Sequence, residues 1–180
     1  MKKINTLAGI AVLAILLLSA CGKKNPAKVY EDTIAALPED EYTATVDIGL
    51  EYPVLLTTDE VYDDGSGDEA AIYCDVYYPV DKKVQKIGSV ESMGTAYPIA
   101  CSRDGIYSVL DGGVQKYTAD ASGKLAMTQN IYVSYDEQGN AAYFSGDGSS
   151  AQSVSADVYD SAQDAYTKCT VVSFTQKQVK

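Results

Sequence analysis

The chain has 180 residues, with 14 basic and 25 acidic side chains, 15 Tyr, four Cys and neither His nor Trp. This length suits a single domain, because a chain of about 150 residues already buries nearly 70% of its unfolded surface in one core. A net charge of −11 and an isoelectric point near 4.3 exclude nucleic-acid binding, which needs a basic surface. The absence of His excludes serine–histidine triads and His-based metal sites.

The first residues have the pattern of an export signal. Lys2 and Lys3 give a positive start, and residues 4–20 carry no charge. Seventeen uncharged residues are short for a stable membrane span and fit the core of a signal peptide. A simple N-terminal membrane anchor and an ordinary cleaved secretory signal are the alternatives.

The sequence Leu18-Ser19-Ala20-Cys21 resembles the lipobox of bacterial lipoproteins. In that family the Cys receives a diacylglyceryl group and becomes the first residue of the mature protein. The resemblance implies a signal peptide at residues 1–20, a lipidated Cys21 and a short tether within residues 21–25. Residues 26–180 would then form a single β-rich domain, held by the lipid at the extracytoplasmic face of the cell membrane.

The first predicted elements are a helix and two strands. Residues 26–37 predict a short helix that begins with Pro26 and ends at Pro38. Its apolar side is expected to hold Val29, Thr33, Ala36 and Leu37. From residue 41 to 50 the apolar period becomes 2, which predicts a half-buried strand with Tyr42, Ala44, Val46, Ile48 and Leu50 facing inward. Residues 53–57 are a continuous apolar run and predict a buried strand.

Short strands dominate the middle of the chain. Residues 70–80 have the strongest strand pattern, and a turn at residues 81–83 predicts a hairpin with residues 84–90. The inward side of the first of these strands is expected to be Ala70, Ile72, Cys74, Val76, Tyr78 and Val80. Further strands are predicted at residues 96–101, 106–110, 114–119, 131–135 and 141–145. Strands spaced 8–12 residues apart and joined by Gly- and Asp-rich turns are typical of an antiparallel meander.

The C-terminal region returns to a helix before a last strand. Residues 146–153 are Gly- and Ser-rich and predict a mobile loop. Residues 157–168 predict a helix with Val158, Ala162 and Ala165 on its apolar side, and residues 169–174 predict a strand that closes a sheet edge. The fold class is therefore mainly β: an antiparallel meander forming a propeller-blade-like unit, a small sandwich or a half-barrel, with a short helix at each end.

An acidic loop at residues 63–69 is the nearest approach to a metal site. Asp64, Ser66 and Asp68 place oxygens at alternate positions, as calcium loops do. Glu69 occupies the sixth position from Asp64, where an EF-hand requires Gly, so an EF-hand is excluded. A weak calcium site and a solvated hairpin loop remain as alternatives, and no other cofactor is expected.

Two segments carry a second resemblance. Residues 42–57 resemble a degenerate FG-GAP/VCBS-type unit, and residues 74–84 resemble the strand–turn–strand that follows it. Small clostridial-type surface lipoproteins carry such a unit once, behind a lipobox. The resemblance implies a β fold with a calcium loop, which would fall between Asp47 and Pro53.

The cysteines left after lipidation are Cys74, Cys101 and Cys169, all in predicted strands. In an exported protein one pair among them can form a disulfide, and three pairings are possible. The alternative is three buried, reduced thiols that pack as small apolar side chains. The sequence leaves both alternatives open.

Composition favours a binding role over catalysis. The tyrosines can form a sugar-stacking platform, or they can be strand residues with no ligand. No catalytic residues are distinguished by their spacing. We expect a surface lipoprotein with a non-catalytic binding or adaptor role, its partner being a wall or surface glycan or a protein. The alternative is an extracellular carbohydrate- or wall-active enzyme that uses a carboxylate pair.

Overall fold

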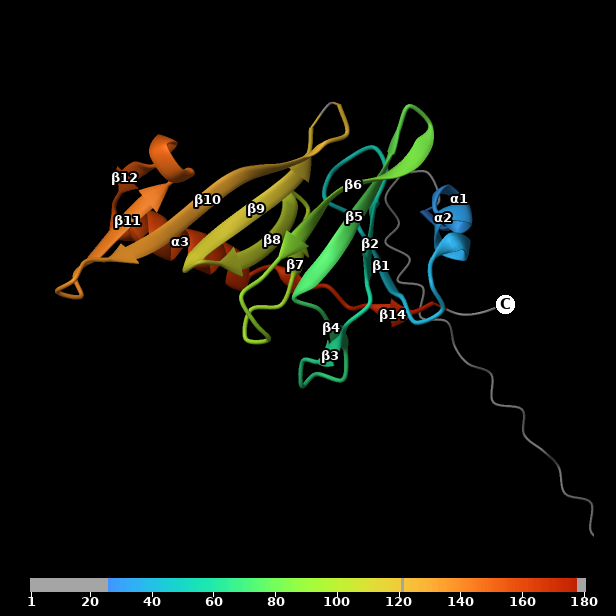
Figure 1. Ribbon diagram of the computed structural model, residues 1–180, viewed down its shortest axis with the longest axis horizontal. Helices are drawn as coiled ribbons and strands as arrows, with labels where there is room; N and C mark the ends of the chain where they lie inside the picture. The colour runs from blue at the N-terminus through green and yellow to red at the C-terminus, as the bar shows by residue number, and fades with distance from the viewer. Residues whose placement is uncertain (1–25, 121, 178–180) are drawn as a thin grey trace, which may run out of the picture.

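The computed structural model describes residues 26–120 and 122–177 (Figure 1). These residues form two large antiparallel sheets and a two-stranded hairpin, with few helices, and the sheets do not close into a barrel. The predicted fold class, mainly β and antiparallel, is confirmed. The expected signal peptide, Cys21 and the tether lie outside the described residues. No helix within the described ranges is long and apolar enough to cross a membrane.

The first sheet has five strands in the order β14-β1-β2-β5-β6. Their bounds are β1 Tyr42–Val46, β2 Val54–Thr58, β5 Tyr73–Val80, β6 Lys83–Glu91 and β14 Thr175–Gln176. The predicted alternation in and after β1 is confirmed, since Ala44, Val46 and Ile48 are buried. All five residues of β2 are buried, as its continuous apolar run predicts.

The strand predicted at residues 70–80 begins later than expected. Ala70 belongs instead to a small hairpin formed by β3 Tyr62–Asp63 and β4 Glu69–Ala70. Ala71, expected to face outward, is fully buried, whereas Ile72 is only half-buried. Cys74 and Val76 are fully buried as predicted. Beyond Val76 the register with β6 shifts by one residue at a bulge.

The second sheet has seven strands in the order β12-β11-β10-β9-β8-β7-β13. Their bounds are β7 Ala100–Ser102, β8 Gly105–Leu110, β9 Gly113–Ala119, β10 Leu125–Tyr135, β11 Ala141–Ser145, β12 Gln152–Val154 and β13 Thr170–Val171. The strand predicted at residues 96–101 is mostly a loop, because Pro98 has no amide hydrogen to give to a ladder. The Gly- and Ser-rich segment contains β12 and a 3₁₀ turn, η1 Gly148–Ser150, so it is not the irregular loop that its composition predicts.

Helix α3, Ala156–Thr167, packs on one face of the seven-stranded sheet (Figure 1). The predicted helix is confirmed, but its buried side is Ala162 and Tyr166, with Tyr159 half-buried. Val158, expected on the apolar side, is 41% exposed. The tyrosines account for the difference, because their rings fill the contact with the sheet while the Tyr166 hydroxyl donates to the Pro98 carbonyl at 2.7 Å.

The N-terminal helix is divided in two. It consists of α1 Pro26–Val29 and α2 Glu31–Ala36, with Tyr30 between them. Tyr30 is fully buried and donates its hydroxyl to the Pro53 carbonyl at 2.6 Å. Ala36, expected on the apolar side, is exposed. The break therefore lets one tyrosine fix both short helices to the five-stranded sheet.

The C-terminal segment joins the two sheets. In place of one strand at residues 169–174 it forms β13, which pairs with β7, and β14, which pairs with β1. Between these strands the Val172 amide donates to the Ile99 carbonyl at 3.0 Å. The Phe174 amide donates to the Glu69 carbonyl at 2.8 Å. The predicted edge closure therefore occurs at one edge of each large sheet.

Two apolar clusters fill the interior. One contains residues of both large sheets, with Val54, Leu56, Val76, Val90 and Ile106 among its members. The other lies between the seven-stranded sheet and α3. The first cluster holds the hairpin tips of the two sheets near each other.

Candidate functional site

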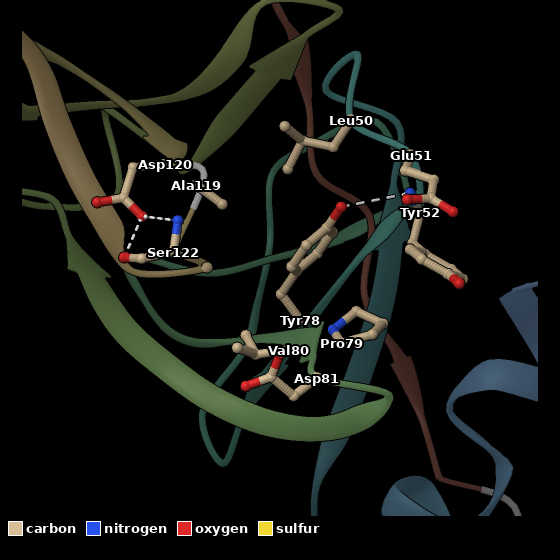
Figure 2. Close-up of a pocket in the computed structure, with 11 residues that line it drawn as sticks. Leu50, Glu51, Tyr52, Tyr78, Pro79, Val80, Asp81, Ala119, Asp120 and Ser122 are labelled. Atoms are coloured by element: carbon tan, nitrogen blue, oxygen red, sulfur yellow. Dashed lines mark hydrogen bonds between the residues drawn. The ribbon is translucent and has the colours of Figure 1, made fainter.

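An open pocket of about 630 Å³ lies between three loops (Figure 2). The loop after β1 contributes Leu50, Glu51 and Tyr52. The end of β5 and its turn contribute Tyr78, Pro79, Val80 and Asp81. The turn between β9 and β10 contributes Ala119, Asp120, Ser122 and Gly123. Residues from both sheets therefore meet at this hairpin-tip pocket.

Gly123 allows the turn between β9 and β10 to contact the end of the β5–β6 hairpin. It lies at a φ of +73°, which favours glycine, and a Cβ built on it would overlap a methyl group of Val80. On the β5–β6 side, Asp81 and Lys82 have φ values of 50° and 65°, as a type I′ turn requires. The tight turn and the bare glycine together set the width of the pocket.

Two tyrosines form one wall of the pocket. The rings of Tyr52 and Tyr78 meet edge to face, with centroids 6.2 Å apart and planes at 79°. The Tyr78 hydroxyl points toward the backbone of Tyr52, whose N–H donates to it at 3.5 Å (Figure 2). Tyr78 also packs against the cluster between the sheets. Its ring is therefore held from two sides while part of it faces the pocket.

Each of the three loops contributes one carboxylate to the pocket, namely Glu51, Asp81 and Asp120. Oδ1 of Asp120 accepts hydrogen bonds from the Ser122 amide at 2.8 Å, the Ser122 hydroxyl at 2.6 Å and the Lys124 amide at 3.0 Å. The Ser122 hydroxyl and these amides hold the pKa of Asp120 below its usual range. Glu51 and Asp81 are exposed on the other two loops, and no Lys or Arg is among the residues that line the pocket. The pocket is therefore negative at neutral pH.

The acidic loop brings two of its three predicted calcium ligands together. Oδ1 of Asp64 accepts from the Ser66 hydroxyl at 2.6 Å and from the Ser66 amide at 2.8 Å. These hydrogen bonds hold the pKa of Asp64 below its usual range. Asp68 is held less closely to Ser66, whose hydroxyl donates to Oδ2 of Asp68 at 3.5 Å. Its Oδ1 accepts instead from the Ser173 hydroxyl at 3.2 Å.

The described residues contain no group of three or more acidic or cysteine side chains placed to hold a metal ion. The hydrogen bonds within the acidic loop use the oxygens that a cation would need. In the loop between β1 and β2, Oδ1 of Asp47 accepts from the Gly49 amide at 2.9 Å. Calcium binding at Asp64, Ser66 and Asp68 stays a prediction.

Cys74, Cys101 and Cys169 are free thiols in the structure. Thr170 pairs with Cys101, so these two side chains lie on the same face of the sheet. Cys169 precedes Thr170 by one residue and therefore points to the other face. Cys101 accordingly packs against the cluster between the sheets and Cys169 against the one under α3. Burial raises the pKa of Cys101 to about 11, aided by the nearby thiol of Cys169. These features favour the reduced alternative and disfavour a Cys101–Cys169 disulfide.

The sequence located this pocket only in part. It predicts Tyr78 in a strand and Asp81 in a turn, but nothing in it indicates that the loop after β1 meets the turn between β9 and β10. The one available signal was Asp120-Ala121-Ser122-Gly123, an Asx-type turn ending in glycine. That pattern predicts the turn but not its neighbour across the pocket.

No protein-family model matches the chain, and no curated protein or solved structure is significantly similar to it. Both resemblances, to lipobox lipoproteins and to FG-GAP/VCBS-type units, therefore stay predictions.

Proposed function

We propose that the chain is a lipid-anchored binding protein at the extracytoplasmic face of the membrane, with a non-catalytic binding or adaptor role. The observation that carries this proposal is the hairpin-tip pocket, where a fixed pair of tyrosines meets carboxylates from separate loops. An open, tyrosine-bearing pocket suits the recognition of a ligand group presented from outside.

The pocket's chemistry suits a positively charged group. Tyrosine rings attract cations through their faces, and carboxylates add Coulombic attraction. Glu51, Asp81 and Asp120 supply that charge, in a chain whose formal charge is −11. The ligand class is therefore a basic group on a peptide or on a wall fragment. Because the acids are exposed, binding should weaken as salt is added.

The carboxyl groups support binding over the alternative of carboxylate-pair hydrolysis. A glycosidase needs a general acid whose pKa is raised. Every described carboxyl with a shifted pKa is shifted downward instead, namely Asp64, Asp75, Asp104, Asp120 and Asp136. Carboxyls of this kind stay ionised at neutral pH, which suits structural hydrogen bonds and cation binding.

The anchor fits the position of the pocket. Tyr30, just after α1, bonds to Pro53, the residue next to Tyr52 of the pocket wall. Residues 22–25 separate the predicted lipid on Cys21 from α1. A short tether would therefore keep this pocket at the membrane-proximal end of the protein.

Lipid anchoring is tested by metabolic labelling with a fatty-acid analogue. Cys21→Ala should abolish labelling and leave the uncleaved precursor in the membrane. Cys74→Ala is the matched control, because Cys74 is a buried thiol that no lipid should reach, and it should label normally. Unchanged labelling of Cys21→Ala would contradict the anchor.

Binding is tested on an array of basic peptides, wall fragments and glycans, using the full-length chain in detergent. Tyr78→Ala should remove the main signal, because it deletes the ring fixed in the pocket wall. Tyr135→Ala is the control, since Tyr135 is 66% exposed and lies outside the pocket. Equal binding by wild type and Tyr78→Ala would contradict a role for this pocket.

A further inference from the structure

The face of the seven-stranded sheet opposite α3 is open at its far end. Ile131 and Val114 pair with each other and belong to the cluster under α3. Because side chains alternate along a strand, Gln115, Asn130 and Tyr132 project to the opposite face. Figure 1 shows β10, β11 and β12 extending away from the five-stranded sheet and from α1. This open face therefore lies far from α1, the first described element of the chain.

An aromatic platform lies on the open face. Tyr132 of β10 and Phe144 of β11 are directly opposite each other in the ladder. Their rings are stacked, with centroids 5.4 Å apart and planes at 24°. Both residues are only half-buried. Because the rings stack face to face, Phe144 supports one face of the Tyr132 ring, and the other face of that ring is left as a flat apolar surface.

A polar groove of about 320 Å³ adjoins the platform, with Gln115, Asn130, Tyr132 and Asp147 among its lining residues. Oε1 of Gln115, a residue only 8% exposed, accepts from the Tyr117 hydroxyl at 2.5 Å. Nδ2 of Asn130 donates to Oδ1 of Asp147 at 3.0 Å. Oδ1 of Asn130 is buried without a partner in the described structure. The groove therefore offers both hydrogen-bond donors and acceptors.

The size of the groove depends on Gly113. A Cβ built on Gly113 would lie 2.6 Å from Cβ of Tyr132 and 3.1 Å from Oδ1 of Asn130. A side chain at this position would fill the floor beside the platform. The resulting volume is at the small end of the range for ligand pockets, which suits one ring-sized group.

We propose that this face is a neutral-glycan site, with one pyranose ring stacked on Tyr132, whose ring Phe144 supports from the other side. A pyranose has an apolar C–H face, which suits stacking on aromatic rings, and a rim of hydroxyls that both donate and accept. The amides of Gln115 and Asn130 match those hydroxyls. Asp111 and Asp147 also line the groove, so anionic sugars are disfavoured.

The glycan site is separate from the hairpin-tip pocket and goes beyond the function proposed for that pocket. The two share no lining residue. Variants at one site therefore serve as controls for the other.

The test is calorimetric titration of the full-length chain with neutral tetrasaccharides of glucose, mannose and N-acetylglucosamine. The detergent is zwitterionic and sugar-free, so that it does not compete. At least one tetrasaccharide should bind, and Phe144→Ala should weaken binding roughly tenfold by removing the ring that holds Tyr132 in place. Gln115→Met keeps the side-chain length but removes the amide, and should weaken binding to a similar extent. Tyr135→Ala, on the α3 side of the same sheet, should stay within about twofold of wild type.

Three results would overturn the glycan site. The first is that no tetrasaccharide binds. The second is that binding survives both Phe144→Ala and Gln115→Met; if Phe144→Ala lowers the melting temperature, Gln115→Met alone decides. The third is that Tyr78→Ala abolishes glycan binding, which would assign the glycan to the hairpin-tip pocket and leave the proposed binding role intact.

Discussion

The five-stranded sheet and the far end of the seven-stranded sheet are built from similar short strands but are covered differently. Every residue of β2 is buried, between the cluster shared by the sheets on one side and the segment anchored by Tyr30 on the other. In β11 and β12 no residue is fully buried. α3 covers only one face there. The first region carries the stability of the fold, and the second leaves the rings of Tyr132 and Phe144 partly exposed.

The largest expected effect tests the buried region. Val76→Asp places an unpaired carboxylate in the cluster between the sheets and should cost several kcal/mol, enough to prevent folding. The matched control is Val158→Asp, because Val158 is 41% exposed near the start of α3. It should change the free energy of unfolding by less than about 0.5 kcal/mol. Urea denaturation measures both, and equal effects would refute the contrast.

The next effect concerns the contact between the hairpin tips. Gly123→Ala adds a methyl group that overlaps Val80 at a positive φ, and should cost about 3 kcal/mol. Gly139→Ala is the control, because Gly139 has a φ of +82° but no atom within 4 Å of the added Cβ. It should cost only about 1 kcal/mol, from backbone strain. If both variants unfold alike, the tips do not touch as described.

The buried region was the more predictable of the two. The alternation in residues 41–50 and the apolar run at residues 53–57 predict both strands, because burial of one face leaves a period of two and burial of both faces leaves a continuous apolar run. No pattern in the sequence predicts the bulge after Val76 or the start of β5 at Tyr73. The burial of Tyr30 and Tyr166 was also not predictable. A tyrosine has an apolar ring and a polar hydroxyl, so its sequence position alone does not indicate whether it is buried.

The candidate sites were less predictable than the fold. Asp120 and Tyr52 meet in one pocket only through long-range packing of two hairpin tips, which periodicity does not encode. The same holds for Gln115 and Asn130, whose pairing depends on the register of β9 and β10. Turn chemistry predicted the acidic loop correctly as a turn, and the hydrogen bonds of Asp64 and Ser66 follow from it.

A smaller effect concerns the outer face of the five-stranded sheet. Burial raises the pKa of Asp75, but hydrogen bonds from Lys86, Tyr73 and Ser89 outweigh it, so the pKa is lowered. A lowered folded-state pKa means that this contribution is fully present above the unfolded value of about 3.9 and is lost as the pH falls through the folded value. Asp75→Asn should cost about 1 kcal/mol at pH 7 and less at pH 3. Urea denaturation at the two pH values tests this, and a cost that does not change with pH would contradict it.

The smallest expected effect is at the acidic loop. If Asp64, Ser66 and Asp68 bind calcium, they do so weakly, because the loop's own hydrogen bonds must first be broken. Millimolar calcium should then stabilise the chain by at most about 1 kcal/mol, seen as a small rise in melting temperature. The double variant Asp64→Asn with Asp68→Asn should abolish the rise. Micromolar binding would contradict this expectation.

The most direct test of the proposed binding role is NMR chemical-shift mapping on the full-length chain with the best ligand from the array. We expect the amide signals of Tyr52, Tyr78 and Ser122 to shift together as the ligand is added, because all three line the hairpin-tip pocket. The signals of the acidic loop at residues 63–69 should not move. Shifts confined to that loop or to α3, with the pocket signals unchanged, would contradict the account.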